Sequence, residues 1–251
     1  MSVPLDTAVR ATGTTLERYY RWHAPVYDLT RWAFLFGRSA LLRRLGAGPA
    51  PRHVLEVGCG TGRNLATLAR RFPNARLTGV DLSDAMLARA EPRLHVFGSR
   101  VRCLRSQFEA PLSLDPPCDV VLVSYALSMM NPGYAQALRA AAAQLPLKGR
   151  IAVVDFAASP WPWFRRWMAR NHVRLDDHLL PMLQTSFDPE VTEVRHAYGG
   201  AWQYFLFIGR AGGDEGREPT ALSLTRPSGT LSRGTGEGRD EGRFVGSTLH
   251  P

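Results

Sequence analysis

The sequence predicts an α/β fold with a largely parallel, seven-stranded sheet, because short apolar strands alternate with helical segments. The clearest unit starts with the apolar run 54–57, which a glycine-rich loop joins to a helical segment over 64–71. Further strands are predicted at 76–80, 100–104, 118–124 and 150–155. Two last strands, at 191–198 and 202–208, are predicted to form a closing hairpin. This order is typical of a doubly wound sheet with helices on both faces.

The composition indicates a globular protein of a reducing compartment. The chain has 251 residues, of which 45% are hydrophobic, enough for one sizeable core. Its three cysteines are widely spaced, so we expect no disulfide framework, no metal site and a cytoplasmic location. No apolar run is long enough to span a membrane, and we expect no signal peptide.

The charge of the chain leaves two interpretations open. The formal net charge is +9, and the segment 211–251 contributes −1 to it because it holds five arginines and six acidic residues. A strongly basic body favours an anionic partner, either nucleic acid or an anionic membrane surface. The alternative is a composition that prefers arginine to lysine, since Lys148 is the only lysine. No nucleic-acid motif is present, so we expect no nucleic-acid partner.

Five residues predict the ligand. Gly58, Gly60 and Gly62 recur at every second position, where glycine permits a positive φ and a close approach of the ligand to the backbone. Glu56 precedes the loop, and a carboxylate there would repel a pyrophosphate but suits an ammonium group. Asp81 follows the second strand, where an acidic residue usually holds a ribose diol. S-adenosylmethionine (SAM) carries both groups.

These five residues resemble motif I of the class I SAM-dependent methyltransferases. The resemblance implies a Rossmann-like sheet, SAM as the cofactor and S-adenosyl-L-homocysteine as its product. The alternative is a glycine turn in another α/β fold, with Asp81 as a helix cap. The cofactor-binding residues that the resemblance implies are Tyr27, Glu56, Gly58, Cys59, Gly60, Gly62, Asn64, Asp81, Leu82, Met86, Gln107, Phe108, Ser124 and Tyr125.

Two of these positions need a comment: Gln107 departs from the family pattern, and Met86 has an alternative role. Gln107 stands where many members have aspartate, and its amide can still pair with the edge of the adenine. Met86 is similar to a residue that packs near the adenine, and an ordinary core methionine is the alternative.

Residues 1–50 are predicted to form N-terminal lid helices, with Pro25 between two of them. Tyr20, His23 and Tyr27 are spaced so that they share one face, which makes them the candidate catalytic residues. Tyr27 and the aspartate after it resemble a pair that closes over SAM in many class I methyltransferases. His23 is suited to accept a proton from an amine, although bulk water could do so as well. The alternative is that the aromatic residues only pack the helix onto the sheet.

The segment 19–38 resembles the N-terminal signature of the bacterial betaine-lipid N-methyltransferases. The resemblance implies that diacylglyceryl-homoserine is converted to diacylglyceryl-N,N,N-trimethylhomoserine, with the enzyme that makes diacylglyceryl-homoserine as a partner. The family is similar to the phosphatidylethanolamine N-methyltransferases, which are one alternative; a methyltransferase of a soluble small molecule is another. Aromatic faces such as those of Tyr20, Tyr27 and Trp202 could hold the quaternary product by cation–π contact. Arg31, Arg165 or Arg166 could pair with the homoserine carboxylate.

The segment 160–172 predicts a contact with membranes. Trp163, Phe164, Trp167 and Met168 fall on one helical face, and arginines surround it. A basic amphipathic helix rich in tryptophan is typical of an interfacial membrane element, so we expect the protein at the inner face of the cytoplasmic membrane. A helix packed onto the core is the alternative. The catalytic domain is predicted to span 51–210, and residues 211–251 are predicted to be a disordered tail.

Overall fold

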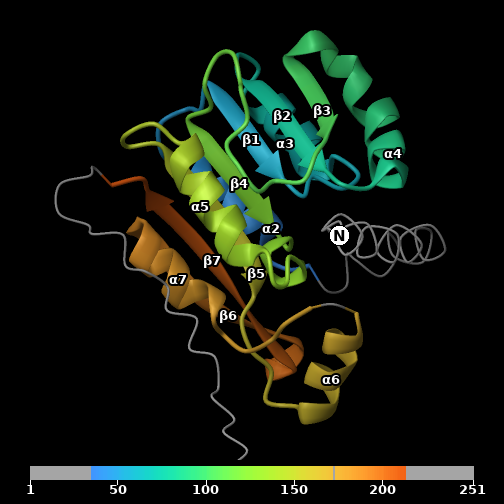
Figure 1. Cartoon of the computed structure of the whole chain (residues 1–251), viewed down its shortest axis with the longest axis vertical. Helices are drawn as coiled ribbons and strands as arrows, with labels where there is room; N and C mark the ends of the chain where they lie inside the picture. Colours follow the sequence, from blue (N-terminus) through green and yellow to red (C-terminus); the bar gives the residue numbers. More distant parts are fainter. Residues whose placement is uncertain (1–34, 172, 213–251) are drawn as a thin grey trace, which may run out of the picture. The chain divides into compact units, whose positions relative to one another are not determined.

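The computed structural model describes residues 35–171 and 173–212. Within them, a seven-stranded sheet has the order β3-β2-β1-β4-β5-β7-β6 (Figure 1). The first five strands are parallel, and β7 runs antiparallel to both of its neighbours, β5 and β6. The strands are β1 (His53–Val57), β2 (Arg76–Asp81), β3 (Val101–Arg105), β4 (Val120–Ser124), β5 (Arg150–Phe156), β6 (Asp188–Ala197) and β7 (Trp202–Arg210). This arrangement confirms the predicted seven-stranded, doubly wound Rossmann-like fold.

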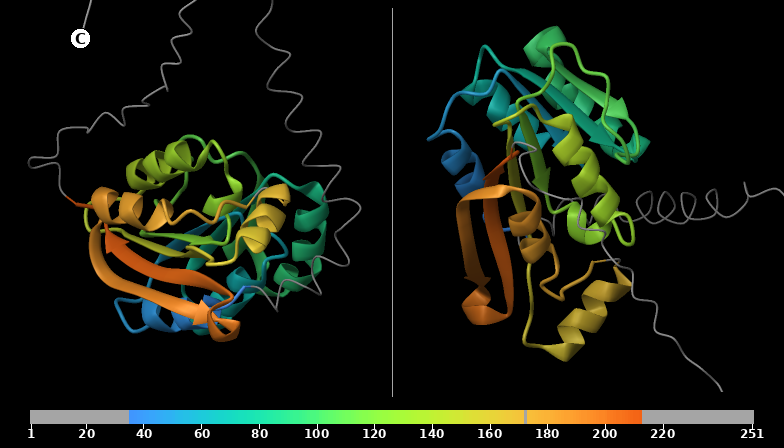
Figure 2. Two further views of the ribbon diagram at one scale, coloured as in Figure 1. Left: turned by 90° about the horizontal axis from the view of Figure 1, so that it is seen from below. Right: turned by 60° about the vertical axis from the view of Figure 1, so that its left-hand side comes forward.

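Helices cover both faces of the sheet (Figure 2). Helices α2, α3 and α4 pack on one face, and α5 and α7 pack on the other. The α-helices are α2 (Arg38–Leu45), α3 (Arg63–Arg71), α4 (Asp84–Leu94), α5 (Tyr134–Gln144), α6 (Pro162–Arg170) and α7 (Leu179–Ser186). Short 3₁₀ turns, η1 (His95–Arg100), η2 (Leu127–Met129) and η3 (Tyr198–Gly200), complete the described elements.

The two faces of the sheet build two apolar layers, because side chains alternate along each strand. In β4, Val120 and Leu122 join the layer beneath α2 and α3. Val121 and Val123 join the layer beneath α5 and α7. Every residue of β1, β4 and β5 is buried, as expected for central strands covered on both sides.

Some boundaries differ from the predictions. The eight-residue α7 was not predicted, because a short apolar run with Pro181 has no clear helical period. Strand β6 begins at Asp188, three residues earlier than predicted. The predicted lid helices before residue 35 and the tail after residue 212 lie outside the described residues. None of the described helices has the length and apolar character to cross a membrane.

Candidate cofactor site and the adjoining cavity

The candidate site lies where three parallel strands end. Strand β1 pairs in parallel with both β2 and β4, so their carboxyl ends meet at one edge of the sheet. The chain leaves β1 toward α3 on one face and leaves β4 toward η2 and α5 on the other. Open parallel sheets bind their ligands where the connections diverge in this way. Glu56, Asp81 and Ser124 stand at or next to these three strand ends, as predicted.

The glycine loop is held tightly against its neighbours. Gly58 has a φ of 70°, and a Cβ atom on it would lie 2.6 Å from the Cβ of Ala126. Gly62 also has a φ of 70°, and its Cβ would lie 2.8 Å from Cδ1 of Leu94. The loop is fixed to β2 because the N–H groups of Gly58 and Cys59 donate to the carbonyl of Val80 at 2.9 and 3.0 Å. Residues with side chains would strain the backbone at both glycines.

Glu56 is held from the first turn of α3. Its side chain is buried, and its Oε1 accepts a hydrogen bond of 2.7 Å from Nδ2 of Asn64. A buried carboxylate carries a large desolvation cost unless donors surround it. Asn64 therefore fixes the Glu56 carboxylate at the base of the glycine loop.

A small hollow opens above this carboxylate. It is lined by Glu56, Gly58, Cys59, Asn64 and Ser124, and by Arg38, Thr61 and Arg63 from the neighbouring segments. Ser124 Oγ is buried and has no hydrogen-bond partner within the described part of the chain. An ammonium group in the hollow would meet a carboxylate and a hydroxyl, and a carboxylate would meet two guanidinium groups. The residues therefore fit the amino-acid end of SAM.

Asp81 ties two loops together. Its Oδ2 accepts from the N–H of Gly60 at 2.8 Å, and its Oδ1 accepts from the N–H of Ser83 at 2.9 Å. Ser83, rather than Asp81, caps α4, because its Oγ accepts from the N–H of Met86 at 3.3 Å. The helix-cap alternative for Asp81 is therefore wrong, and a contact of its carboxylate with a ribose stays a prediction.

The residues predicted around the adenine differ in their exposure. Leu82 is 45% exposed beside Asp81, which suits a residue that covers a flat ring. Met86 and Phe108 are buried, and Phe108 belongs to the layer beneath α5 and α7. Gln107 is exposed and donates to the carboxylate of Glu109. An adenine contact by Gln107 stays a prediction.

Cys59 packs beneath the loop as a neutral thiol. A Cβ atom on Gly79 would lie 2.7 Å from Cys59 Sγ, so the thiol fills the space above β2. Hydrogen bonding to Cys103 and burial raise the pKa of Cys59. Cys59 therefore shapes the loop from below.

Tyr125 positions α2 through its hydroxyl group. The residue is buried with a φ of 55°, and its Oη donates to the carbonyl of Phe36 at 2.7 Å. The guanidinium carbon of Arg38 lies 5.9 Å from the centre of the Tyr125 ring. Burial raises the pKa of Tyr125 well above its usual range. Tyr125 therefore connects the end of β4 to the start of α2.

The remaining predicted residues include four that the structure does not describe and one that is buried in the core. Tyr20, His23, Tyr27 and Arg31 lie outside the described residues. Trp202 is only 3% exposed, and its ring stacks on Phe164 with centroids 5.3 Å apart. Trp202 is therefore a core residue, and the prediction that it offers a face to a cation is wrong.

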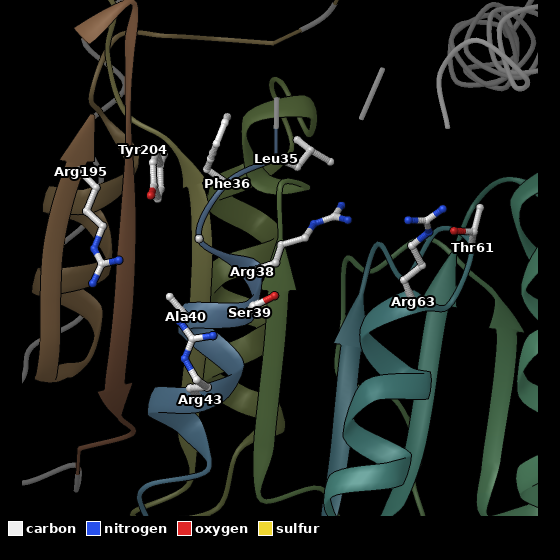
Figure 3. Close-up of a pocket in the computed structure, with 11 residues that line it drawn as sticks. Leu35, Phe36, Arg38, Ser39, Ala40, Arg43, Thr61, Arg63, Arg195 and Tyr204 are labelled. Carbon is white, nitrogen blue, oxygen red and sulfur yellow. The ribbon is translucent and has the colours of Figure 1, made fainter. Parts of the chain in front are cut away.

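A larger cavity of about 440 Å³ adjoins the hollow (Figure 3). It lies between the start of α2, the start of α3 and the strands β6 and β7. Arg38, Thr61 and Arg63 line both spaces, so the two share a wall. Sequence reasoning did not find Arg43, Arg195 and Tyr204, which come from three separate elements. No group of three or more His, Cys, Asp or Glu side chains within 35–171 and 173–212 is placed to hold a metal ion.

Comparisons with known proteins identify the domain. Residues 54–149 match the family described as "Methyltransferase domain". Among solved structures, the chain is similar to 1,6-didemethyltoxoflavin-N1-methyltransferase of Burkholderia thailandensis with bound S-adenosylhomocysteine. That match has a TM-score of 0.63 at 18% identity and covers 85% of this chain and 94% of the other. The N-methyltransferase NodS of Bradyrhizobium japonicum, with S-adenosylhomocysteine, matches with a TM-score of 0.57 at 20% identity, over 69% and 84% of the two chains. At these identities the likeness shows the fold alone.

Curated relatives match smaller parts of the chain. A ubiquinone/menaquinone biosynthesis C-methyltransferase of Syntrophotalea carbinolica is 31% identical over 140 residues, which is 53% of this chain and 58% of the relative. A trans-aconitate 2-methyltransferase of Acidovorax is 52% identical over 46 residues, 18% of each chain. The chain therefore spans less than two thirds of the length of these relatives. The matches and the fold confirm the prediction of a methyltransferase domain of the SAM-dependent class.

Proposed function

We propose that this chain, whose residues 54–149 match the family described as "Methyltransferase domain", is a class I SAM-dependent methyltransferase that acts on the amine of a lipid headgroup at a membrane surface. The substrate that we propose is diacylglyceryl-homoserine, and the product is diacylglyceryl-N,N,N-trimethylhomoserine. The observation that carries the proposal is the outer surface of α6. Trp163 is 66% exposed and Trp167 is 45% exposed on the helix, and Trp161, the residue before it, is 51% exposed.

Helix α6 has one anchored side and one outward side. Phe164 and Met168 are buried, and the Phe164 ring stacks on Trp202. The prediction of a single apolar face is therefore wrong, because Trp163 and Trp167 are exposed whereas Phe164 and Met168 are buried. Exposed tryptophans are costly in water and are typical of helices that lie in the headgroup region of a bilayer.

Arginines surround the exposed rings of α6. Arg165, Arg166 and Arg170 are all exposed. Arg165 also donates to the carbonyl of Ser159 at 2.8 Å, which fixes the start of the helix. Arginines beside interfacial tryptophans favour an anionic surface. We therefore propose peripheral binding to the cytoplasmic face of the inner membrane, where the enzyme that makes diacylglyceryl-homoserine would supply the substrate.

The chemistry of the proposed reaction requires little more than positioning. SAM supplies a methyl group on a positively charged sulfur. The ammonium form of the acceptor first loses a proton to a base or to water. The lone pair of the neutral amine then forms the C–N bond to the methyl group, and the electrons of the broken S–CH₃ bond stay on the sulfur. Glu56, Asn64 and Asp81 hold the cofactor end in place, and the neighbouring cavity receives the amine. His23 is our candidate for the base, in the segment outside the described residues.

A soluble acceptor is the second candidate function. It is favoured by the names of the relatives, which methylate a quinone precursor and trans-aconitate. Such an enzyme would not need the exposed tryptophans of α6. Phosphatidylethanolamine is a third acceptor that would use α6 in the same way.

One assay separates these acceptors. The protein is incubated with methyl-labelled SAM and, in turn, diacylglyceryl-homoserine, phosphatidylethanolamine and a demethylated quinone, each in phosphatidylcholine vesicles. We expect label in the homoserine lipid. Label in phosphatidylethanolamine alone would show that this lipid, and not diacylglyceryl-homoserine, is the acceptor. Label in the quinone alone would overturn the lipid-amine proposal.

A further inference from the structure

The larger cavity beside the cofactor hollow has an unusual lining. Four of its lining residues are arginines, Arg38, Arg43, Arg63 and Arg195, and the lining contains no acidic residue among the described part of the chain. Arg38 and Arg43 come from the first and last turns of α2, Arg63 from the start of α3 and Arg195 from strand β6. Figure 3 shows Arg38 extending toward Arg63, with Arg195 on the opposite side of α2.

The positive charge of the cavity is only partly balanced by neighbouring carboxylates. Glu193 pairs with Arg195, and it also pairs with Arg44 at 2.7 Å. Within the described residues, no carboxylate pairs with Arg43 or Arg63. Guanidinium groups that share one hollow repel each other, and the repulsion falls when an anion binds between them. The cavity is therefore suited to an anionic group.

The other lining residues indicate what accompanies that anion. The hydroxyl groups of Ser39, Thr61 and Tyr204 offer further hydrogen bonds, and Leu35 and Phe36 form an apolar edge. Arg38, Thr61 and Arg63 form the wall shared with the cofactor hollow. Arg43 and Arg195 line only the larger cavity, so a ligand that they hold would lie in that cavity, beside the shared wall.

We infer that the cavity is an anion subsite for the methyl acceptor, in which Arg43 and Arg195 bind a carboxylate or phosphate that lies next to the amine. The inference rests on the proposed function and deepens it, since it names the acceptor class as a zwitterionic headgroup. It also moves the anion contact from Arg165 and Arg166, which lie on α6 and do not line the cavity. The same positive charges favour the neutral amine over the ammonium form, and only the neutral amine can attack.

The test compares two cavity variants with a matched control. Arg43→Gln and Arg195→Gln each remove one guanidinium group from the larger cavity and none from the cofactor hollow. Arg139→Gln on α5 removes an exposed helical arginine outside both spaces. Each protein is assayed with diacylglyceryl-homoserine, its carboxamide analogue and phosphatidylethanolamine in phosphatidylcholine vesicles. Calorimetry measures the affinity for SAM.

We expect both cavity variants to raise KM for the two zwitterionic lipids by about 10- to 100-fold. This is the effect of losing a hydrogen bond to a charged group. The affinity for SAM and the Arg139→Gln kinetics should equal those of the parent. For the carboxamide analogue, the parent protein should have a high KM, and the two cavity variants should have the same value. A larger effect on the homoserine lipid than on phosphatidylethanolamine identifies a carboxylate, and the reverse identifies a phosphate. Unchanged KM values for both lipids would overturn the inference while the proposed function stands.

A separate measurement covers the case in which no lipid amine is methylated. Glycerophosphoethanolamine and O-glyceryl-homoserine are then titrated by calorimetry into the protein loaded with S-adenosylhomocysteine. Binding to the parent and to Arg139→Gln, with loss in Arg43→Gln and Arg195→Gln, supports the anion subsite although the lipid activity has failed. No binding to the parent, or equal binding to all four proteins, overturns it.

Discussion

Removing the exposed tryptophans of α6 should weaken membrane binding, and the exposed areas of their side chains set an upper limit on the effect. A tryptophan buries up to about 250 Å². From their exposed fractions of 66% and 45%, Trp163 and Trp167 offer about 165 and 110 Å² to a bilayer. At about 25 cal/mol per Å², full insertion would stabilise the bound state by about 4 and 3 kcal/mol. Rings that lie half-inserted at the headgroup level would contribute about half of that sum, which is still more than a hundredfold in vesicle affinity.

The arginines of α6 should contribute differently. Arg165, Arg166 and Arg170 are expected to add about 1 kcal/mol each against an anionic surface. This contribution should fade with salt, because exposed charges are screened within about 8–10 Å at moderate ionic strength. The apolar contribution of the tryptophans should not fade. The salt dependence of binding therefore separates the two sets of side chains.

The assay is co-sedimentation with phosphatidylglycerol-containing vesicles at low and high salt. It compares the parent, the double variant Trp163→Ala/Trp167→Ala and the triple Arg→Gln variant. Leu147→Ala is the control, since Leu147 is 66% exposed between α5 and β5, away from α6. Thermal unfolding checks that each variant folds, because both tryptophan rings also contact Phe164, with centroids 5.7 Å apart. If the folded double variant sediments like the parent at high salt, α6 is not the membrane contact.

Three further predictions concern the cofactor site and the core. Asp81→Asn should weaken SAM binding by about 10- to 100-fold, since it removes a charge that ties Gly60 and would hold the ribose; an unchanged calorimetric affinity would contradict this role. Gly60→Val should abolish SAM binding, because a branched side chain at a φ of 53° strains the loop and fills the ligand's space; normal binding would refute the cofactor assignment. Burial raises the pKa of Asp155 from 3.8 to about 6, so the folded state keeps a proton that the unfolded chain loses. The free energy of unfolding should fall by about 3 kcal/mol as pH rises through this window and then level off, a slope that Asp155→Asn should lack in denaturant titrations.

The part of the fold that forms the cofactor site could be predicted because the residues that determine it lie close together in the sequence. One strand, a glycine loop and a helix are contiguous in the chain, and the acid of the next strand follows at a fixed spacing. Parallel pairing of β1 with β2 then brings Asp81 to the loop without further information. The same reasoning found Ser124 at the end of β4.

The acceptor half could not be predicted in this way. Arg43 and Arg195 are about 150 positions apart, and only the pairing of β6 with β7 and the packing of α2 bring them to one cavity. The amphipathic pattern of α6 predicted a helix, but it could not say that Phe164 would face inward while Trp163 faces outward. That division depends on Trp202, the first residue of a strand far along the chain.

The position of β7 in the sheet determines the order in which the protein can be assembled during synthesis. Strand β6 touches the sheet only through β7, although β7 leaves the ribosome after it. The strands β1 to β5 can pair as they emerge, so the glycine loop and Asp81 can come together on the nascent chain. Helix α6 also waits for β7, since its anchor Phe164 packs on Trp202. A growing chain therefore acquires its cofactor half first, and it presents the tryptophans of α6 in their final orientation only when its last described strand has been made.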